Sequence, residues 1–238
     1  MITKEKTRAV VTGATRGIGY AITERLMSDG FDVIGTGTGK EAKCPEGASY
    51  RQVDFLDDKS MEDFVDFLKN KKIDVLVNNA GINKIGSFAE IDINDFDKIF
   101  RVNLRAPFLF CQAVIPNMKK NKWGRIVNIS SIFGVITKEL RASYSTSKFG
   151  LDGMTAALSA EVAEAGILAN CVAPGFIDTD LTRNVLGLQG IKDLSEKIPA
   201  KRIGNVGEIA SLVSWLVSKE NTYLSGQNII IDGGFSRV

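Results

Sequence analysis

Tyr144 and Lys148 stand four positions apart in the segment Tyr144-Ser145-Thr146-Ser147-Lys148. On a helix, positions i and i+4 share one face, so the Lys148 ammonium can lie near the Tyr144 phenol. A phenol has an ordinary pKa of about 10, and a fixed cation nearby lowers that pKa by favouring the phenolate. The pair is therefore a candidate proton-transfer device, although a lysine on a solvated helix face would give the same spacing.

The residue types that are missing restrict the chemistry further. The chain contains no histidine, which is the side chain most often used for acid–base catalysis near neutral pH and the commonest metal ligand. Its three cysteines, Cys44, Cys111 and Cys171, are far apart and in no CxxC or metal-like spacing. We therefore expect no disulfide framework and no metal site, and a reducing, cytoplasmic location.

The bulk composition predicts one globular domain over residues 1–238. Of the 238 residues 44% are hydrophobic and 24% charged, which is enough to bury one substantial core. Thirty basic and 28 acidic residues give a net charge of +2, which argues against nucleic acid or a membrane surface as the main partner. The N-terminal segment has no apolar signal region, and no run of about 18 apolar residues occurs elsewhere.

Short β-branched segments alternate with amphipathic ones along the whole chain, which predicts βαβ units and a parallel sheet. The predicted strands are 8–11, 32–34, 73–77, 125–129, 168–172 and 228–231. The predicted helices are 18–28, 60–70, 94–103, 106–119, 145–164 and 206–218. The expected fold class is α/β, with a single Rossmann-type doubly wound parallel sheet of about seven strands and helices on both faces.

Two connections depart from this alternation. Residues 36–40 form a glycine-rich loop after the second predicted strand, and the connection over 174–202 is long. Long connections at the carboxyl ends of parallel strands are typical of lids and binding loops. We expect a substrate lid at about 176–202, whose leucines either cover an apolar substrate or pack the lid onto the body.

The segment Thr12-Gly13-Ala14-Thr15-Arg16-Gly17-Ile18-Gly19 follows the first predicted strand and opens the first predicted helix. Glycines here permit a tight turn and the close approach of a pyrophosphate to free backbone N–H groups at the helix N-terminus. The spacing is GxxxGxG, which matches the GxGxxG dinucleotide fingerprint only in part. A glycine-rich structural turn is the alternative interpretation.

Five motifs in a fixed order give the chain a family resemblance. They are the GxxxGxG turn, Asn78-Asn79-Ala80-Gly81, Ser131 thirteen residues before Tyr144, the Tyr144/Lys148 pair, and Pro174-Gly175. Together they resemble the classical short-chain dehydrogenase/reductase family over about 8–234. In detail the chain is similar to the 3-oxoacyl-[acyl-carrier-protein] reductase group of that family, in the segments 11–19, 174–180, 198–199, 224–227 and 232–234.

This resemblance implies a catalytic tetrad that reduces a ketone. Ser131 and Tyr144 would share the developing alkoxide oxygen, the first as a donor and the second as general acid. Lys148 would bridge the nicotinamide ribose and the tyrosine, and Asn103 would hold a water that resupplies protons. Each residue also has an ordinary structural role open to it, such as a strand-end cap for Ser131 or a helix end for Asn103.

The cofactor follows from the same resemblance and from charge. An NAD-specific site places a carboxylate against the ribose 2′-hydroxyl, and the family's position for that acid is Gly37 here. Arg16, Thr38 and Lys40 instead offer a cation and a hydroxyl for a 2′-phosphate, so we expect NADP(H). The residues expected to bind it are Gly13, Thr15, Arg16, Gly17, Ile18, Gly19, Thr38, Asp54, Phe55, Asn79, Ala80, Gly81, Tyr144, Lys148, Pro174, Gly175, Ile177 and Thr179.

The substrate side departs from the acyl-carrier-protein reductase pattern. Asn83-Lys84-Ile85 lacks the usual arginine–aspartate pair, Arg141 stands where that group commonly has glutamine, and Glu164-Ala165 replaces a basic residue. An acidic carrier protein prefers a basic surface, so the last change weakens the case for that partner. Lys84 and Arg141 could instead hold an anionic group on a small substrate. The expected substrate contacts are Phe133, Arg141 and Phe176.

Two functional classes remain. The first is an NADPH-dependent ketone reductase acting on a 3-oxoacyl thioester, as in fatty acid biosynthesis, or on another carbonyl such as a sugar or keto acid. The second is a non-catalytic NADP-binding regulatory module, which would have no reason to keep the whole tetrad. The resemblance also implies a homotetramer, formed through the helix that carries Tyr144, the helix before the fifth strand and the C-terminal segment.

Overall fold

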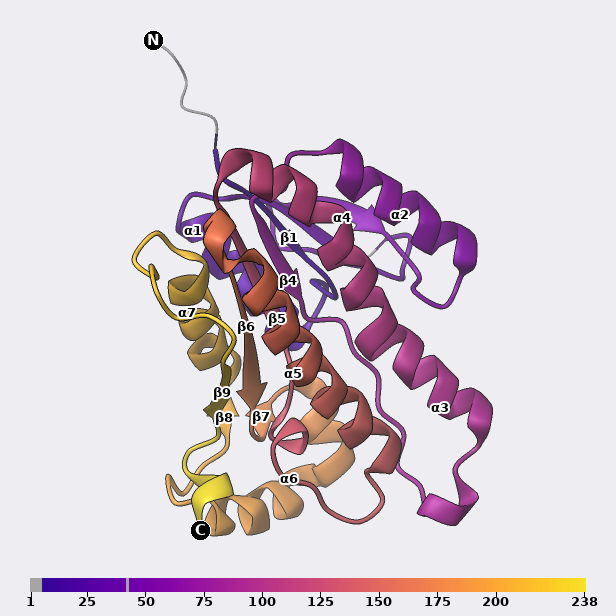
Figure 1. The fold of residues 1–238 in the computed structure, drawn as a ribbon. Coiled ribbons are helices and arrows are strands. Elements are labelled where there is room, and N and C mark those ends of the chain that lie inside the picture. Colours follow the sequence, from indigo (N-terminus) through magenta and orange to yellow (C-terminus); the bar gives the residue numbers. More distant parts are fainter. Residues whose placement is uncertain (1–5, 42) are drawn as a thin grey trace.

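The computed structural model describes residues 6–41 and 43–238, which form a parallel sheet covered by helices on both faces (Figure 1). The sheet has seven strands in the order β3-β2-β1-β4-β5-β6-β9. Their bounds are β1 Arg8–Val11, β2 Asp32–Gly37, β3 Ser49–Gln52, β4 Val75–Asn78, β5 Gly124–Ile129, β6 Ile167–Pro174 and β9 Asn228–Ile231. Every pairing in it is parallel. The predicted Rossmann-type doubly wound sheet is confirmed.

Successive residues of each strand face opposite cores, as the two-residue period of a strand requires. Val10, Leu76 and Ile126 pack under helices α2 (Asp58–Asn70), α4 (Ala106–Asn121) and α5 (Ala142–Val162). Their neighbours Val11, Val77 and Val127 pack under α1 (Gly17–Ser28) and α7 (Val206–Val217). Strands β4, β5 and β6, in which every residue is buried, are thus covered on both faces.

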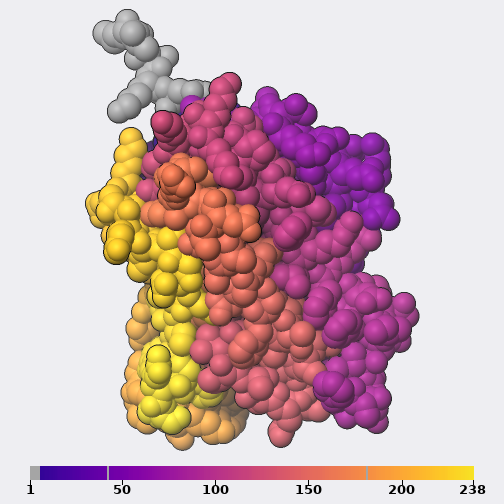
Figure 2. Space-filling view, in the orientation of Figure 1, coloured from indigo at the N-terminus to yellow at the C-terminus, as the bar shows by residue number. Residues whose placement is uncertain are grey.

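The carboxyl ends of the parallel strands together form one edge of the sheet, and most of the irregular structure lies there. In Figures 1 and 2 this is the lower end of the molecule, which carries helix α6 (Asp180–Lys197) and the C-terminal turn η5 (Phe235–Arg237). A short pair of strands, β7 (Ile177–Asp178) and β8 (Gly204–Asn205), joins the two ends of the connection that contains α6. This is the edge at which ligands bind in open α/β sheets.

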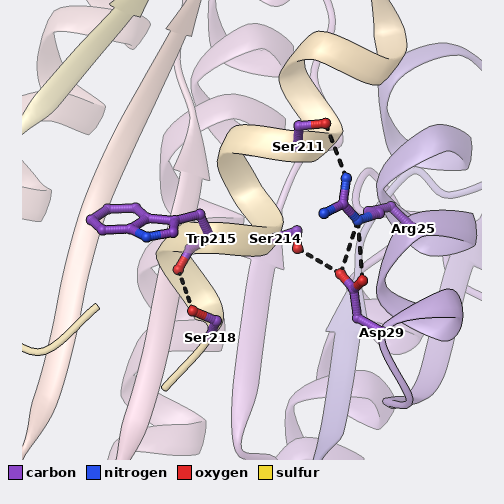
Figure 3. A network of polar contacts seen from close by, with 6 residues as sticks. All are labelled: Arg25, Asp29, Ser211, Ser214, Trp215 and Ser218. Carbon is purple, nitrogen blue, oxygen red and sulfur yellow. Dashed lines mark hydrogen bonds and ion pairs between the residues drawn. The ribbon is translucent and has the colours of Figure 1, made fainter. Parts of the chain in front are cut away.

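Helices α1 and α7 are joined by a polar network (Figure 3). The Arg25 guanidinium pairs with Asp29 at 3.1 Å and donates to Ser211 Oγ at 3.0 Å. Ser214 Oγ donates to Asp29 Oδ2 at 2.5 Å. Exposed ion pairs contribute little on their own, so the network chiefly fixes the crossing of two helices already packed by apolar residues.

Helices α3 (Ile93–Phe100) and α4 are joined without a break by a π-helical turn, η2 (Arg101–Arg105). The predicted helices 94–103 and 106–119 are both present, but the prediction did not show that they are continuous. A π turn inserts one extra residue into the helix and often marks a functional site. Here it turns Asn103 into the interior, where only 1% of its surface is exposed.

Among the elements that were not predicted are strand β3 and helix α6. Strand β3 is polar and partly exposed at the sheet edge, so it lacks the apolar signal used for the other strands. Helix α6 occupies much of the connection that was expected to be an irregular lid, and it bends at Gly187, whose φ is 63°. Across the described part of the chain, no helix combines the length and apolar character that spanning a membrane requires.

Candidate active site

The glycine turn after β1 is locked to the loop after β4 by Thr12 and Asn79. Thr12 Oγ1 accepts from the backbone N–H groups of Asn79 and Ala80, both at 3.0 Å. Asn79 Nδ2 returns hydrogen bonds to the carbonyls of Thr12 and Gly13 at 2.9 and 3.1 Å. The two predicted cofactor segments therefore form one rigid unit.

This unit has no room for side chains at Gly13 and Gly19. A Cβ on Gly19 would lie 2.2 Å from the Gly13 carbonyl oxygen, and one on Gly13, whose φ is 66°, would lie 3.0 Å from the Ala80 Cα. The helix N-terminus behind the turn presents free N–H groups, with Arg16 as the N-cap and Gly17 and Ile18 starting α1. A turn of this shape fits a dinucleotide pyrophosphate.

The segments on the other side of the turn come from β6 and α6. Thr179 caps α6 by accepting from Thr182 N at 3.2 Å, and its methyl group lies 3.4 Å from where a Gly17 Cβ would be. Gly175 donates to the Ile231 carbonyl at 2.9 Å, which ties Pro174-Gly175 to β9. The Ile177 side chain packs into the core, so only its backbone can face a cofactor.

The loop after β2 is held in place by residues that the sequence analysis did not single out. Tyr50 donates to the Gly39 carbonyl at 2.5 Å, and Gln52 Nε2 donates to the Thr38 carbonyl at 2.9 Å. A Cβ at Gly37 would lie 2.6 Å from Thr15 Cγ2 and 3.2 Å from the Tyr50 hydroxyl. A carboxylate at position 37, as in an NAD-specific site, would therefore require the Thr15 side chain to move.

Asp54 and Phe55 are placed differently from each other. The Asp54 carboxylate accepts from Leu56 N at 2.9 Å in the turn before α2. The Phe55 ring is buried against Phe64 and Phe110, with ring centroids 6.4 and 5.0 Å away. Phe55 was predicted to bind the cofactor, but its side chain belongs to the core because it completes this aromatic cluster, so any cofactor contact is limited to its backbone.

Asn103 connects the loop after β4 to helix α5. Its Nδ2 donates to the Ile82 carbonyl at 2.9 Å and to Ser147 Oγ at 3.1 Å, and its Oδ1 accepts from Ile82 N at 2.8 Å. A Cβ at Gly81 would lie 3.4 Å from Asn103 Oδ1 and 3.6 Å from Lys148 Nζ. Asn103 and Lys148 thus meet at Gly81, and the water relay through Asn103 stays a prediction.

Ser131, Tyr144 and Lys148 lie together at the end of β5 and on the first turns of α5. The Ser131 side chain lies close enough to the Tyr144 phenol to lower its pKa. Lys148 Nζ lies 5.6 Å from the centre of the Tyr144 ring and donates to the Ile129 carbonyl at 2.8 Å. Ser131 Oγ also accepts from Phe133 N at 3.2 Å, which fixes the serine.

The electrostatics of the pair differ from the sequence-based prediction. Burial raises the pKa of Tyr144, and this outweighs the lowering of its pKa by the Ser131 side chain and by the Arg141 charge. Burial also lowers the pKa of Lys148 to about 8. The prediction that Lys148 makes Tyr144 acidic is not met in this structure, because burial of the phenol itself dominates its pKa and the Lys148 ammonium is directed to the Ile129 carbonyl.

The expected substrate side is lined by aromatic rings and one arginine. Phe133, Phe176 and Phe235 form a chain of edge-to-face contacts, with ring centroids 6.3 and 5.2 Å apart. The Arg141 guanidinium lies over the Phe133 ring, 5.4 Å from its centre. Lys84, the other proposed anion ligand, is paired with Asp95 and is no longer a free cation.

The arrangement can protonate an oxygen and hold a dinucleotide at the same edge of the sheet. Within residues 6–41 and 43–238, no group of three His, Cys, Asp or Glu side chains could hold a metal ion. An apolar groove of about 880 Å³ lies elsewhere, between η2, α4 and α5, and its lining includes Phe108, Met154 and Leu158. None of the four predicted catalytic residues lines that groove.

Comparison with known proteins finds relatives that match nearly the whole chain. A family model described as "Enoyl-(Acyl carrier protein) reductase" matches residues 13–236. A 3-oxoacyl-[acyl-carrier-protein] reductase of Aquifex aeolicus is 40% identical over 238 residues, which cover 95% of this chain and 96% of the relative.

Solved structures show the same fold at lower identity. A gluconate 5-dehydrogenase from Burkholderia cenocepacia, in complex with NADP and tartrate, has a TM-score of 0.90 and 28% identity, and the match covers 99% of this chain and 97% of that one. A 4-hydroxyisoleucine dehydrogenase complexed with NADH has a TM-score of 0.90 and 27% identity, covering 98% and 100% of the two chains.

Proposed function

The chain belongs to the short-chain dehydrogenase/reductase family, and from that premise we propose that it reduces a ketone to a secondary alcohol with NADPH. Membership makes it an NAD(P)-dependent oxidoreductase. The observation that carries the proposal is the meeting of Asn103, Ser131, Tyr144 and Lys148 at the strand edge that also holds the glycine turn.

The proposed mechanism assigns each side chain one task. NADPH, when bound, supplies the hydride. Ser131 donates a hydrogen bond to the substrate oxygen, and Tyr144, kept protonated by its raised pKa, gives that oxygen its proton. Lys148 Nζ lies 5.6 Å from the centre of the Tyr144 ring and can return a proton to the tyrosine. Asn103 holds the loop that contains Gly81 against α5.

The preference for NADPH over NADH rests on the loop after β2. An acid at position 37 that would bind the 2′-hydroxyl would require the Thr15 side chain to move, and Arg16 stands exposed at the N-terminus of α1. Arg16 and Thr38 would bind the 2′-phosphate. Replacing Arg16 by Ala should raise the KM for NADPH about tenfold or more and leave the KM for NADH nearly unchanged.

The substrate has two candidates. The relationship to 3-oxoacyl-[acyl-carrier-protein] reductases favours a 3-oxoacyl thioester on the carrier protein or on CoA. The half-buried Arg141 favours a small keto acid instead. The carboxylate compounds named for the structural neighbours, gluconate, tartrate and 4-hydroxyisoleucine, favour it too. In either case we propose that the segment 176–202 closes over the substrate. The chain is proposed to work as one domain and to form a homotetramer in the cytoplasm.

A screen of NADPH oxidation tests the proposal. Acetoacetyl-carrier protein, acetoacetyl-CoA and small keto acids are compared, each also with NADH. Replacing Tyr144 by Phe should lower turnover by about 10²–10⁴ while NADPH binding persists. Tyr223, which is 96% exposed, provides the matched Tyr223→Phe control. Bound NADPH without turnover of any carbonyl by the wild type would instead favour a regulatory binding module.

A further inference from the structure

Arg141 has unused hydrogen-bonding capacity beside the proposed catalytic residues. It precedes α5 by one residue and lies three positions before Tyr144, so the two side chains start about one turn apart. Its Nε is buried and has no hydrogen-bond partner. In the part of the chain that the structure describes, its guanidinium donates no hydrogen bond and forms no ion pair, and the Phe133 ring 5.4 Å away is its only side-chain cation–π partner.

Two other cations, in the predicted substrate loop and the predicted lid, are paired with acids, whereas Arg141 forms no ion pair among the described residues. Lys84 is paired with Asp95, and Arg183 in the lid is paired with Asp178 through two hydrogen bonds. Lys138 adds a second cation 6.0 Å from the centre of the same Phe133 ring. A partly buried guanidinium without an anion is costly, and desolvation lowers the pKa of Arg141.

The residue before Arg141 has an uncommon backbone conformation. Leu140 has a φ of 64°, which a branched side chain rarely adopts. The Leu140 carbonyl accepts from Gly86 N at 3.3 Å, which joins this turn to the loop carrying Lys84. Strain of this kind is retained where the surrounding structure uses it to place a group.

We propose that Arg141 binds a carboxylate of the substrate, one to three bonds from the reacting carbonyl, so that the chain reduces short oxo acids. The inference rests on the proposed ketone reductase activity and narrows its substrate. The planar fork of a guanidinium matches a carboxylate through two parallel hydrogen bonds. The single turn between Arg141 and Tyr144 keeps that carboxylate close to the oxygen that Tyr144 protonates.

The test compares matched acids and neutral esters. Rates of NADPH oxidation are measured for 2-oxobutyrate, acetoacetate and 4-oxopentanoate, each with its methyl ester, and for the acetoacetyl thioester of N-acetylcysteamine. We expect the wild type to prefer at least one acid over its ester by tenfold or more in kcat/KM. Arg141→Gln should reduce that preference at least tenfold, with Arg141→Lys in between. Lys138→Gln, which changes a neighbouring exposed cation, should alter it less than about twofold.

The outcomes separate this inference from the proposed function. Turnover of esters and thioester without preference for any acid would overturn the inference and leave the ketone reductase standing. An equal loss on acid and ester in Arg141→Gln would also overturn it, because Arg141 would then act through Tyr144. Failure of the wild type to oxidise NADPH with any of these carbonyls, despite binding NADPH, would contradict both.

Discussion

Lys148 is the residue whose charge state is most altered by its surroundings. It is 4% exposed, and burial lowers its pKa from an ordinary 10.5 to about 8. Between these two pH values the unfolded chain binds more protons than the native one, so the free energy of unfolding rises with pH in that window. Below about pH 8 both states are protonated and the cost of the buried charge is constant.

A Lys148→Met variant should therefore gain stability relative to the wild type at pH 7, and lose that advantage as the pH rises toward 10. The advantage should shrink by at most about 1.4 kcal/mol per pH unit, starting near pH 8. Urea unfolding of both proteins at several pH values measures it. A difference that stays constant from pH 7 to 10 would show that Lys148 has an ordinary pKa.

The sequence predicted that the proposed catalytic side chains would lie close together but not how their surroundings shift their pKa values. The spacing of Tyr144 and Lys148 placed both on one helix face, and the structure brings them together with Ser131. Desolvation depends on what packs around the pair, which local spacing does not contain. The same limit applies to Phe55, whose ring turned into an aromatic cluster formed by residues distant in the chain.

At the scale of single elements, helix α1 depends on the absence of a side chain at Gly19. A Gly19→Ala variant places a Cβ 2.2 Å from the Gly13 carbonyl oxygen and 2.4 Å from Asn79 Nδ2. We expect it to lose at least about 1–3 kcal/mol of stability and most NADPH binding. Gly153→Ala is the matched helix control. No atom lies within 4 Å of its new Cβ, so it should be neutral or stabilising by up to about 1 kcal/mol.

Helix α5 is attached to the sheet by a buried polar chain. Asn78 Nδ2 donates to Asn128 Oδ1 at 2.8 Å, and Asn128 Nδ2 donates to Thr155 Oγ1 at 2.8 Å. Thr155 in turn donates to the Leu151 carbonyl at 2.7 Å. This series of hydrogen bonds runs from β4 through β5 to the helix that carries Tyr144 and Lys148.

Replacing Thr155 by Val keeps the shape but leaves the buried Asn128 amide without its acceptor. The expected loss is about 1–3 kcal/mol in urea unfolding. Thr146 is the control, since it lies on the same helix and makes the same bond to a carbonyl four residues earlier, but is exposed. Thr146→Val should change stability by less than about 0.5 kcal/mol. Equal losses of stability in Thr155→Val and Thr146→Val would mean that these buried hydrogen bonds do not anchor α5.

For the molecule as a whole, the predicted homotetramer needs an apolar face, and the groove along α4 and α5 offers one. Phe108 beside it is 52% exposed. Phe108→Glu should reduce the mass measured by light scattering if subunits meet on this face. Phe88→Glu is the control, because Phe88 is 83% exposed and does not line the groove. A wild type that is monomeric at micromolar concentration would contradict the homotetramer itself.

The overall architecture was largely predictable because buried parallel strands carry a continuous apolar signal. The six strands proposed from the sequence all lie in the sheet, and the six proposed helices all occur. Strand β3 was missed because Ser49, Arg51 and Gln52 give no apolar pattern, and it pairs only at an edge. Helix α6 was missed because the glycines at 187 and 190 interrupt its helical pattern.

The wide turn at η2 makes this enzyme sensitive to chain length in one place. An α-helix advances by roughly 100° per residue. Losing Leu104 would let α3 and α4 merge into one regular helix in nearly their present orientation, because the π turn holds the one extra residue, and only the side chains within the turn, Asn103 among them, would change direction. Asn103 would then swing off the Ile82 backbone, and the loop beside Lys148 would lose its anchor. A deletion of one residue in 238 would thus separate the helix that carries Tyr144 from the loop after β4, although it would remove no residue of the proposed site.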